Sequence, residues 1–274
     1  MFDNICKFLA ENFRDDLVTW LLGNPIKLTE LKPTELSNEP IRADSLILLQ
    51  SEDLVLHTEF QTDADETMPF RMLDYRVRVY RRYPKKEMRQ VVIYLRPTNS
   101  ELVQQNSFRL SKTYHEFEVI RLWEMPTEKF LQYQGLLPFA VLTQTNEPKI
   151  VLSRVAQAID EITDRNVKTN LTAASAILAN LVISEDIIKG ILRSDIMQES
   201  AIYQEIYHAG ELRGELRGEL KGELKGKLKG ELETQMKITL NLLKKGFSIN
   251  EIVEITGLSS DLVEGLTQNN QSNN

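Results

Sequence analysis

Three side chains that can bind a metal ion or move a proton recur at alternate positions in one short apolar stretch. In LVLHTEFQ, residues 54–61, these are His57, Glu59 and Gln61. Successive side chains of a β-strand point to opposite faces, so a strand here places all three on one face. Carboxylate oxygens are the ligands that Mg²⁺ prefers, and an amide beside them can orient a water molecule. The stretch therefore predicts a strand that carries a polar, chemically competent face.

A second carboxylate opens the preceding strand candidate, RADSLILLQ, residues 42–50, and the turn-like SED joins the two stretches into a predicted hairpin. If residue i pairs with residue 103 − i, Asp44 lies opposite Glu59 on the same face. Two such carboxylates would bind Mg²⁺ or Mn²⁺, with the backbone carbonyl of Phe60 as a further ligand and Gln61 beside a bound water.

Each of these residues also has a simpler interpretation. An aspartate at the start of a strand commonly caps a turn, and a single strand glutamate is commonly solvated. For His57 we favour a structural histidine with satisfied hydrogen bonds, and a metal ligand or general base is the alternative. The combination, rather than any one residue, predicts the site.

A basic segment follows, although the whole chain carries a net charge of −7. Residues 71–96 contain nine Lys or Arg against two acids. The part between Pro69 and Pro84 predicts a helix. On a helical wheel we expect a buried stripe of Phe70, Leu73, Val77 and Tyr80. A separate face would contact DNA phosphates; it consists of Arg71, Tyr75, Arg78 and Arg82.

Composition excludes several classes of protein. The single cysteine, Cys6, excludes an internal disulfide and a cysteine-based zinc motif, and three histidines make an all-histidine metal site improbable. No apolar run approaches the roughly 20 residues of a membrane span, and the acidic start does not resemble a signal peptide. We therefore expect a cytoplasmic protein with no membrane partner.

The elements that must position the site form an α/β pattern. Residues 4–23 predict a first helix that stops at Gly23; the hairpin and the basic helix follow. Residues 89–97 and 115–125 predict a third and a fourth strand, joined by a polar connection over residues 97–113. We expect an α/β core over residues 1–145 and a helical subdomain over residues 146–209.

The C-terminal part changes composition abruptly. Residues 210–232 repeat Gly-Glu-Leu-Lys/Arg every four positions, a spacing that drifts around a helix and places a glycine in every turn. We expect a frayed helical or disordered linker there, and an oligomerisation helix is the alternative. Residues 233–274 predict two short helices with Ser248 and Ser259 as caps and Gly257 in the turn, as in a helix-turn-helix, a pattern that also occurs in helical pairs with no ligand.

Asp44 followed by the triplet Glu59-Phe60-Gln61 resembles the active-site pattern of the PD-(D/E)XK nuclease superfamily, in which an acid on one strand precedes an acid-x-Lys triplet on the next. The closer resemblance is to the Rpn-type family of recombination-promoting nucleases and putative transposases. RADSLILLQ, LHTEFQ and PFRMLDYRVRVY look like that family's Asp-bearing strand, Glu-x-Gln strand and Phe-Arg-x-x-x-Tyr helix, and the start FDNICKFLAENF and the repeat tail also look similar. The likeness covers most of residues 1–210.

The resemblance implies a restriction-endonuclease-like core and Mg²⁺-dependent DNA endonuclease activity of low sequence specificity, with a role in recombination or transposition. It implies that Asp44 and Glu59 hold the metal and that an acid of the first helix assists, for which we select Glu11 over Asp3 and Asp16. Gln61 departs from the superfamily lysine and lacks its positive charge, which leaves more electrostatic work to the metal and to Arg71. The alternatives are a non-catalytic DNA-binding or scaffolding protein with a nuclease fold and a homo-oligomer assembled through the C-terminal helical region.

Overall fold

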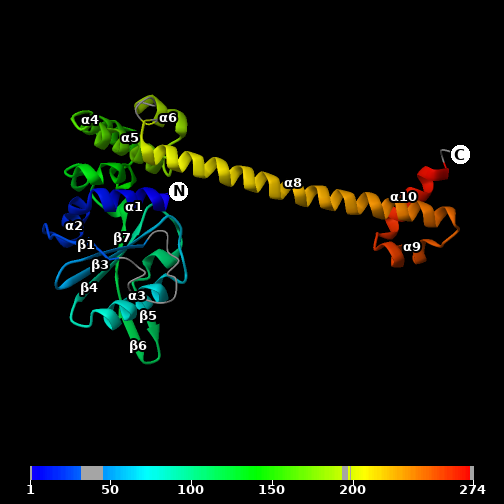
Figure 1. The fold of residues 1–274 in the computed structure, drawn as a ribbon, viewed down its shortest axis with the longest axis horizontal. Helices are drawn as coiled ribbons and strands as arrows, with labels where there is room; N and C mark the ends of the chain where they lie inside the picture. Colours follow the sequence, from blue (N-terminus) through cyan, green and yellow to red (C-terminus); the bar gives the residue numbers. More distant parts are fainter. Residues whose placement is uncertain (1, 32–45, 193–196, 198, 272–274) are drawn as a thin grey trace. The chain divides into compact units, whose positions relative to one another are not determined.

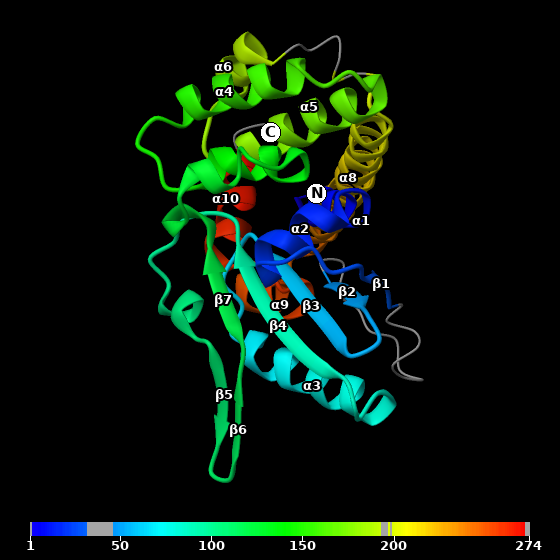
Figure 2. The same cartoon turned by 90° about the vertical axis from the view of Figure 1, so that its left-hand side faces the viewer.

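A computed structural model describes residues 2–31, 46–192, 197 and 199–271. The chain divides into two compact units, Met1–Ile206 and Tyr207–Asn274. The first unit contains a mixed five-stranded sheet with helices on both faces (Figures 1 and 2). The predicted α/β class is therefore confirmed.

The sheet has the strand order β1-β2-β3-β4-β7. The strands are β1 (Thr29–Glu30), β2 (Leu46–Gln50), β3 (Leu54–Gln61), β4 (Glu87–Tyr94) and β7 (Glu118–Arg121). The pairs β1–β2 and β2–β3 are antiparallel, whereas the pairs β3–β4 and β4–β7 are parallel. Parallel neighbours need a crossover, and α3 (Met68–Arg82) provides it between β3 and β4. The predicted order of helix, hairpin, helix and strand is present.

The register of the β2–β3 hairpin differs from the predicted one by two residues. Leu46, not Asp44, is the Cα partner of Glu59, and Gln50 pairs with Val55. The Ser51 N–H donates to the Leu54 carbonyl at 2.9 Å, so the turn consists of Glu52 and Asp53 and lies one residue further along the chain than the predicted register places it. A shift of two residues preserves which face each side chain occupies, so the predicted face of β3 is unaffected.

Two helices rather than one cover the first face of the sheet. They are α1 (Phe2–Asn12) and α2 (Arg14–Leu22), and Gly23 ends α2 with a φ of 76°, the left-handed conformation that glycine adopts without strain. Ile5 and Leu9 of α1 share the main apolar core with Leu56 and Phe60 of β3. This side of the sheet is therefore the apolar one.

α3 covers the opposite face, and its predicted orientation is wrong. Three of the four side chains expected to be buried are exposed, Phe70 by 57%, Val77 by 45% and Tyr80 by 62%, and the fourth, Leu73, is half-buried. Met72, Tyr75 and Val79 are buried instead. The sheet face beneath α3 carries polar side chains of β3 and β4, which can be buried only against hydrogen-bonding partners, so the helix turns its Arg and Tyr face inward.

The predicted polar connection over residues 97–113 contains structure that the sequence pattern did not indicate. A short 3₁₀ helix, η2 (Glu101–Gln104), precedes the hairpin β5 (Ser107–Leu110) and β6 (Thr113–Glu116). This hairpin extends beyond the end of the main sheet (Figure 2). The single fourth strand predicted over residues 115–125 is therefore wrong, because its first residues belong to β6 and only Glu118–Arg121 joins the main sheet as β7.

Helical segments complete the first unit. They are η3 (Leu122–Glu124), η4 (Thr127–Lys129), η5 (Gln134–Leu142), α4 (Pro148–Asp160), α5 (Arg165–Ala179) and α6 (Glu185–Ile191). Buried residues of η5, α4 and α5 belong to the same apolar core as α1 and β3. Among the described residues, no helix combines the length and the apolar character that a membrane span needs.

The second unit contains most of the long helix α8 (Ala201–Lys244), then α9 (Ile249–Thr256) and α10 (Ser260–Gln271). The repeat segment, residues 210–232, is thus helical throughout, so the prediction of a disordered linker is wrong. The predicted helix pair is confirmed: Ser248 and Glu251 form a capping box at the start of α9, and Gly257 ends it with a φ of 70°. Ile252, Leu258 and Val263 form its small apolar core.

Candidate active site beneath the crossover helix

β3 separates apolar from polar side chains as the alternation predicts. The Phe60 ring stacks on Phe139 in the main core, with ring centroids 5.5 Å apart. His57 and Glu59 project from the other face, toward α3, and both are fully buried. The Glu59 end of β3 is also the carboxyl end shared with the parallel β4, where ligands commonly bind in open α/β sheets.

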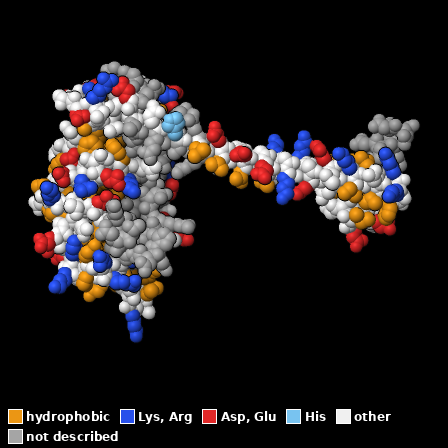
Figure 3. Space-filling model, in the orientation of Figure 1, with side chains coloured by type: hydrophobic (Ala, Val, Ile, Leu, Met, Phe, Trp, Pro, Cys, Tyr) orange, Lys and Arg blue, Asp and Glu red, His pale blue; other side chains and the backbone are white. Residues whose placement is uncertain are grey.

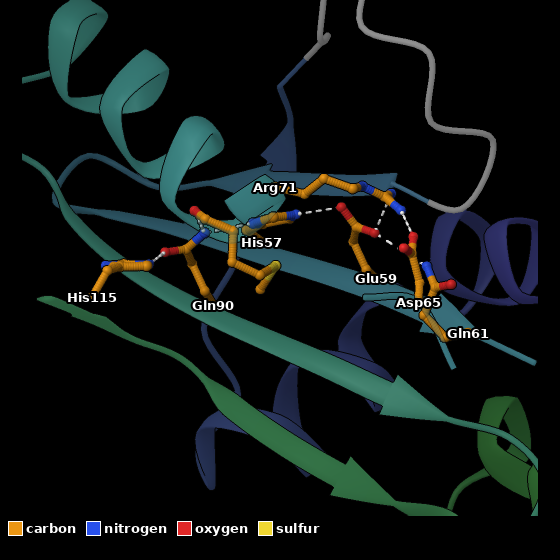
Figure 4. Close-up of polar contacts among 8 residues, drawn as sticks. His57, Glu59, Gln61, Asp65, Arg71, Gln90 and His115 are labelled. Atoms are coloured by element: carbon orange, nitrogen blue, oxygen red, sulfur yellow. Dashed lines mark hydrogen bonds and ion pairs between the residues drawn. The ribbon is translucent and has the colours of Figure 1, made fainter. Parts of the chain in front are cut away.

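The two carboxylate oxygens of Glu59 have different surroundings (Figure 4). Oε2 accepts a 2.5 Å hydrogen bond from Arg71 Nη2 and a 3.2 Å bond from Gln61 Nε2. Oε1 is buried and accepts no hydrogen bond from the described residues; its neighbour is His57 Nε2 at 3.5 Å. Since a buried acceptor without a donor is costly, Oε1 is the atom of this site that a further ligand would satisfy.

Arg71 joins Glu59 to a second acid. Its Nη1 donates to Asp65 Oδ2 at 3.0 Å while Nη2 contacts Glu59 (Figure 4). Burial lowers the pKa of Arg71, but the charge of Glu59 and the bond to Asp65 outweigh it and raise that pKa above its ordinary value. Burial likewise raises the pKa of Asp65, but hydrogen bonds from Thr67 and Arg71 hold it below the ordinary value. The guanidinium is therefore a fixed positive charge between two carboxylates.

A line of hydrogen bonds fixes His57. Gln90 Nε2 lies 2.7 Å from the Met72 carbonyl oxygen, and a carbonyl can only accept, so the amide orientation is determined. The same Nε2 lies 2.9 Å from His57 Nδ1, and Gln90 Oε1 lies 2.8 Å from His115 Nε2 (Figure 4). His57 Nδ1 must therefore accept, which places the imidazole proton on Nε2, facing Glu59. These contacts satisfy Nδ1 alone, because the buried Nε2 has no hydrogen-bond partner among the described residues, so the interpretation of His57 as a structural residue with satisfied hydrogen bonds is met only in part.

Two tyrosines close the site. The Tyr75 ring meets the His57 ring edge-on at 4.8 Å, and Tyr94 of β4 is buried. Burial raises the pKa of Tyr75, and the nearby Glu59 charge raises it further. Burial also raises the pKa of Tyr94, and the charges of Asp65 and Glu59 raise it further. Both phenols therefore stay neutral and line an acidic site.

The structure brings together only some of the predicted metal-binding and acidic residues. Glu59 and Gln61 are adjacent, as expected, whereas Asp44 lies outside the described residues. The Phe60 carbonyl is directed to the β2 side of β3, because the next carbonyl, that of Gln61, accepts from Leu95 N–H on the β4 side. Glu11 does not join them.

The first-helix acids belong to the other face of the sheet. Glu11 is exposed on α1 and pairs with Lys7 at 3.9 Å. Its rival Asp16 accepts a 2.7 Å hydrogen bond from Gly135 N–H, and the side chain of Asp3 is outside the description. Because α1 packs on the apolar face and Glu59 points to α3, the prediction that Glu11 assists Glu59 is not met by the geometry.

The predicted DNA-binding face is largely turned inward. Tyr75 is buried, Arg71 binds Glu59 and Asp65, and Arg78 Nε donates to Asp74 at 2.8 Å. Only Arg82 of the four is exposed, with its guanidinium carbon 5.7 Å from the Tyr83 ring centroid. These side chains hold the helix and the site together, so a continuous phosphate-binding face made of all four is not present.

Sequence reasoning missed three site residues. Asp65 lies in the loop TDADET and accepts hydrogen bonds from the Thr67 N–H and hydroxyl. An aspartate two residues before a threonine is a recognisable sequence signal of a turn before a helix. Gln90 lies in β4 just before an apolar run and His115 lies in the unexpected hairpin, and neither had a signal in local spacing. Gln90 reaches His57 through the parallel pairing of β3 and β4, and His115 reaches Gln90 from β6; both contacts are long-range features.

The described residues fit a divalent cation only in part. Glu59 Oε1 is a hard oxygen with no hydrogen bond, the kind of donor that Mg²⁺ takes. No group of three or more His, Cys, Asp or Glu side chains that could hold a metal ion occurs in the described part of the chain. Mg²⁺ commonly takes one or two carboxylates and completes its shell with water and substrate phosphate, so one described carboxylate is compatible with it.

No protein-family model matches the chain, and comparisons with curated proteins and with solved structures gave no match. The likeness to the Rpn-type family therefore depends on the residues quoted above.

Proposed function

We propose that the chain is a divalent-cation-dependent DNA endonuclease of the Rpn type with Glu59 as its central acid. The observation that carries the proposal is the state of this carboxylate. It is fully buried at the carboxyl end of two parallel strands, one oxygen is held by Arg71 and Gln61, and the other accepts no hydrogen bond from a described residue.

The covalent chain supports Asp44 as the second acid. Leu46 is the Cα partner of Glu59, and Asp44 is two residues earlier in the sequence. This closeness in the sequence, and not a described position of Asp44, supports the assignment. The two-residue shift in register leaves this argument intact.

The residues of the site have the following roles in this proposal. The cation, Mg²⁺ or Mn²⁺, would bind to Glu59, with Asp44 and the Phe60 carbonyl as further ligands, and would supply Lewis acidity toward a phosphodiester. Arg71 and Gln61 fix the Glu59 plane through Oε2, while Oε1, whose neighbour is His57 Nε2 at 3.5 Å, accepts no hydrogen bond from a described residue. Arg71 also adds a positive charge where the superfamily has lysine at position 61, which compensates in part for the neutral amide.

The Arg71–Glu59 bond equally favours a second candidate, a DNA-binding protein with a nuclease fold and no turnover. In that case the guanidinium occupies the place of the cation and balances the charges of Glu59 and Asp65. Assembly through the C-terminal region and a cytoplasmic location remain predictions in either case.

Plasmid nicking separates the two candidates. Full-length protein is incubated with supercoiled plasmid and Mg²⁺, with EDTA, and with Mg²⁺ after Glu59→Ala substitution; Glu11→Ala is the matched control on the other face of the sheet. The nuclease proposal expects nicking that EDTA and Glu59→Ala abolish and Glu11→Ala preserves. Salt-sensitive DNA binding without nicking under any divalent ion selects the non-catalytic candidate.

A further inference from the structure

The outer face of α3 and the β5–β6 hairpin leave aromatic and basic side chains uncovered. Phe70, Tyr80 and Tyr114 are exposed by 57%, 62% and 53%. In the space-filling view, Lys and Arg side chains alternate with hydrophobic ones over the part of the first unit where α3 and the hairpin lie (Figures 1 and 3). A patch of large exposed hydrophobic side chains on a protein surface usually marks a binding site.

The cations of this surface differ from those the fold uses. Arg71, Arg78 and Arg89 each bind a carboxylate. Arg81 on α3 and Lys112 in the hairpin turn are exposed, and no ion pair with a described acid was found for them. Arg109 lies over the Tyr114 ring, 4.7 Å from its centroid. Once internal ion pairs are set aside, the acids Glu66 and Glu116 remain on this surface. The exposed cations Arg81, Arg109 and Lys112 outnumber them, which suits an anionic partner.

A hollow of about 360 Å³ lies between the start of α3 and β5. The Phe70 and Phe108 rings line it, with centroids 5.6 Å apart and planes tilted by 57°, so each ring can present a face to a planar ligand. Gln105 and Asn106 add amide groups, Arg109 adds a cation and Glu66 adds an acceptor. Aromatic faces, amides that pair with base edges and a cation for phosphate are the groups that bind an unpaired base.

We propose that this hollow, the Phe70–Phe108 hollow, binds an unpaired base of a nucleic-acid strand, while Arg109 and Lys112 of the hairpin contact neighbouring phosphates. The inference deepens the proposed nuclease function, on which it rests, by naming DNA with unpaired bases as the substrate class. The hollow and the Glu59 site share the start of α3, because Phe70 and Glu66 of the hollow are the sequence neighbours of Arg71 and Asp65. The carboxylate of Glu66 can accept from a base amino group, so its charge does not oppose this occupant.

Binding of a labelled oligodeoxynucleotide, in single-stranded and in duplex form, is measured by fluorescence anisotropy. The full-length protein carries the Glu59→Gln substitution, because this substitution blocks turnover. Stacking of one base contributes about 1–3 kcal/mol, so we expect Phe108→Ala and Phe70→Ala each to weaken single-strand binding about 10-fold. The duplex should bind more weakly than the single strand. Ile150→Ala, an exposed apolar residue on α4, is the matched control and should change nothing.

A second variant guards against a merely structural effect. Phe70→Trp keeps a stacking face, so it should retain affinity, and its added indole fluorescence should be quenched by the single strand. Unchanged affinity in both alanine variants, absence of quenching, or equal binding of duplex and single strand would overturn the inference. An RNA strand that binds while DNA does not would also overturn the DNA assignment. Since binding is read without cleavage, wild-type nicking can persist when this inference fails.

Discussion

Arg71 on α3 donates a 2.5 Å hydrogen bond to Oε2 of Glu59 on β3, and this bond explains why the crossover helix turns its basic face to the sheet. Glu59 is fully buried, so without a cationic neighbour it would carry an uncompensated charge in the protein interior. Two described side chains lie within ion-pair distance of Glu59, those of His57 and Arg71. Of the two, only Arg71 carries a permanent charge. The orientation of α3, and with it the exposed Phe70–Tyr80 stripe, follows from that pairing.

The first prediction concerns the strength of this pair. Removing one partner of a buried ion pair commonly costs 3–5 kcal/mol, so we expect Arg71→Ala to lower the free energy of unfolding by about 3 kcal/mol. The double variant Arg71→Ala/Glu59→Gln should recover part of that loss, because no unpaired charge remains. Urea denaturation measures both. Arg89→Ala, which breaks a more exposed pair with Glu118, should cost less than about 1 kcal/mol, and an equal loss in the two single variants would contradict the account.

The second prediction concerns acid stability. The pKa of Asp65 in the fold is held below its ordinary value of 3.8, so its stabilising effect is complete above that pH and is lost as the pH falls toward the folded value. We therefore expect the stability of the wild type to fall more steeply below about pH 4 than that of Asp65→Asn. Denaturation curves at several pH values test this. Asp63→Asn, a more exposed aspartate paired with Arg96, is the control; identical slopes for wild type and Asp65→Asn would refute the assignment.

The third prediction concerns the proton on His57. The Met72 carbonyl orients the Gln90 amide, which forces His57 Nδ1 to accept and leaves the proton on Nε2. Long-range ¹H–¹⁵N correlation spectra of the wild type should show this tautomer. Gln90→Glu replaces the donor by an acceptor and should move a proton to Nδ1, whereas the surface control Gln132→Glu should not. A wild-type proton on Nδ1 would show that the amide is reversed.

The fourth prediction concerns the packing of η5 against the first helices. A Cβ on Gly135 would lie 2.1 Å from the Cβ of Phe13, a distance that requires a shift of backbone. Gly135→Ala should therefore destabilise the fold by about 1–3 kcal/mol. Gly190 in α6 has no atom within 4 Å of the same position, so Gly190→Ala should be neutral or stabilise by up to about 1 kcal/mol. Thermal unfolding of the two variants gives the comparison; equal stability would be inconsistent with the close approach.

Local patterns predicted the β3 alternation, the limits of α3 and the caps of the C-terminal helix pair, because each depends on neighbours in the sequence. The orientation of α3 could not be predicted in this way. Its wheel has an apolar stripe through Phe70 and a polar face through Arg71, and the choice between them depends on the polar sheet face made by Glu59 and Gln90 together. Pairing between strands 33 residues apart, as in the Gln90–His57 contact, leaves no trace in local spacing.

The central claim is that Glu59 holds the divalent cation, and Mn²⁺ binding measured by electron paramagnetic resonance tests it most directly. Free Mn²⁺ is titrated against full-length wild type, Glu59→Gln and the control Glu11→Gln. We expect wild type and Glu11→Gln to bind the ion and Glu59→Gln to lose that binding. Mn²⁺ binding by Glu59→Gln equal to that of the wild type would contradict the claim.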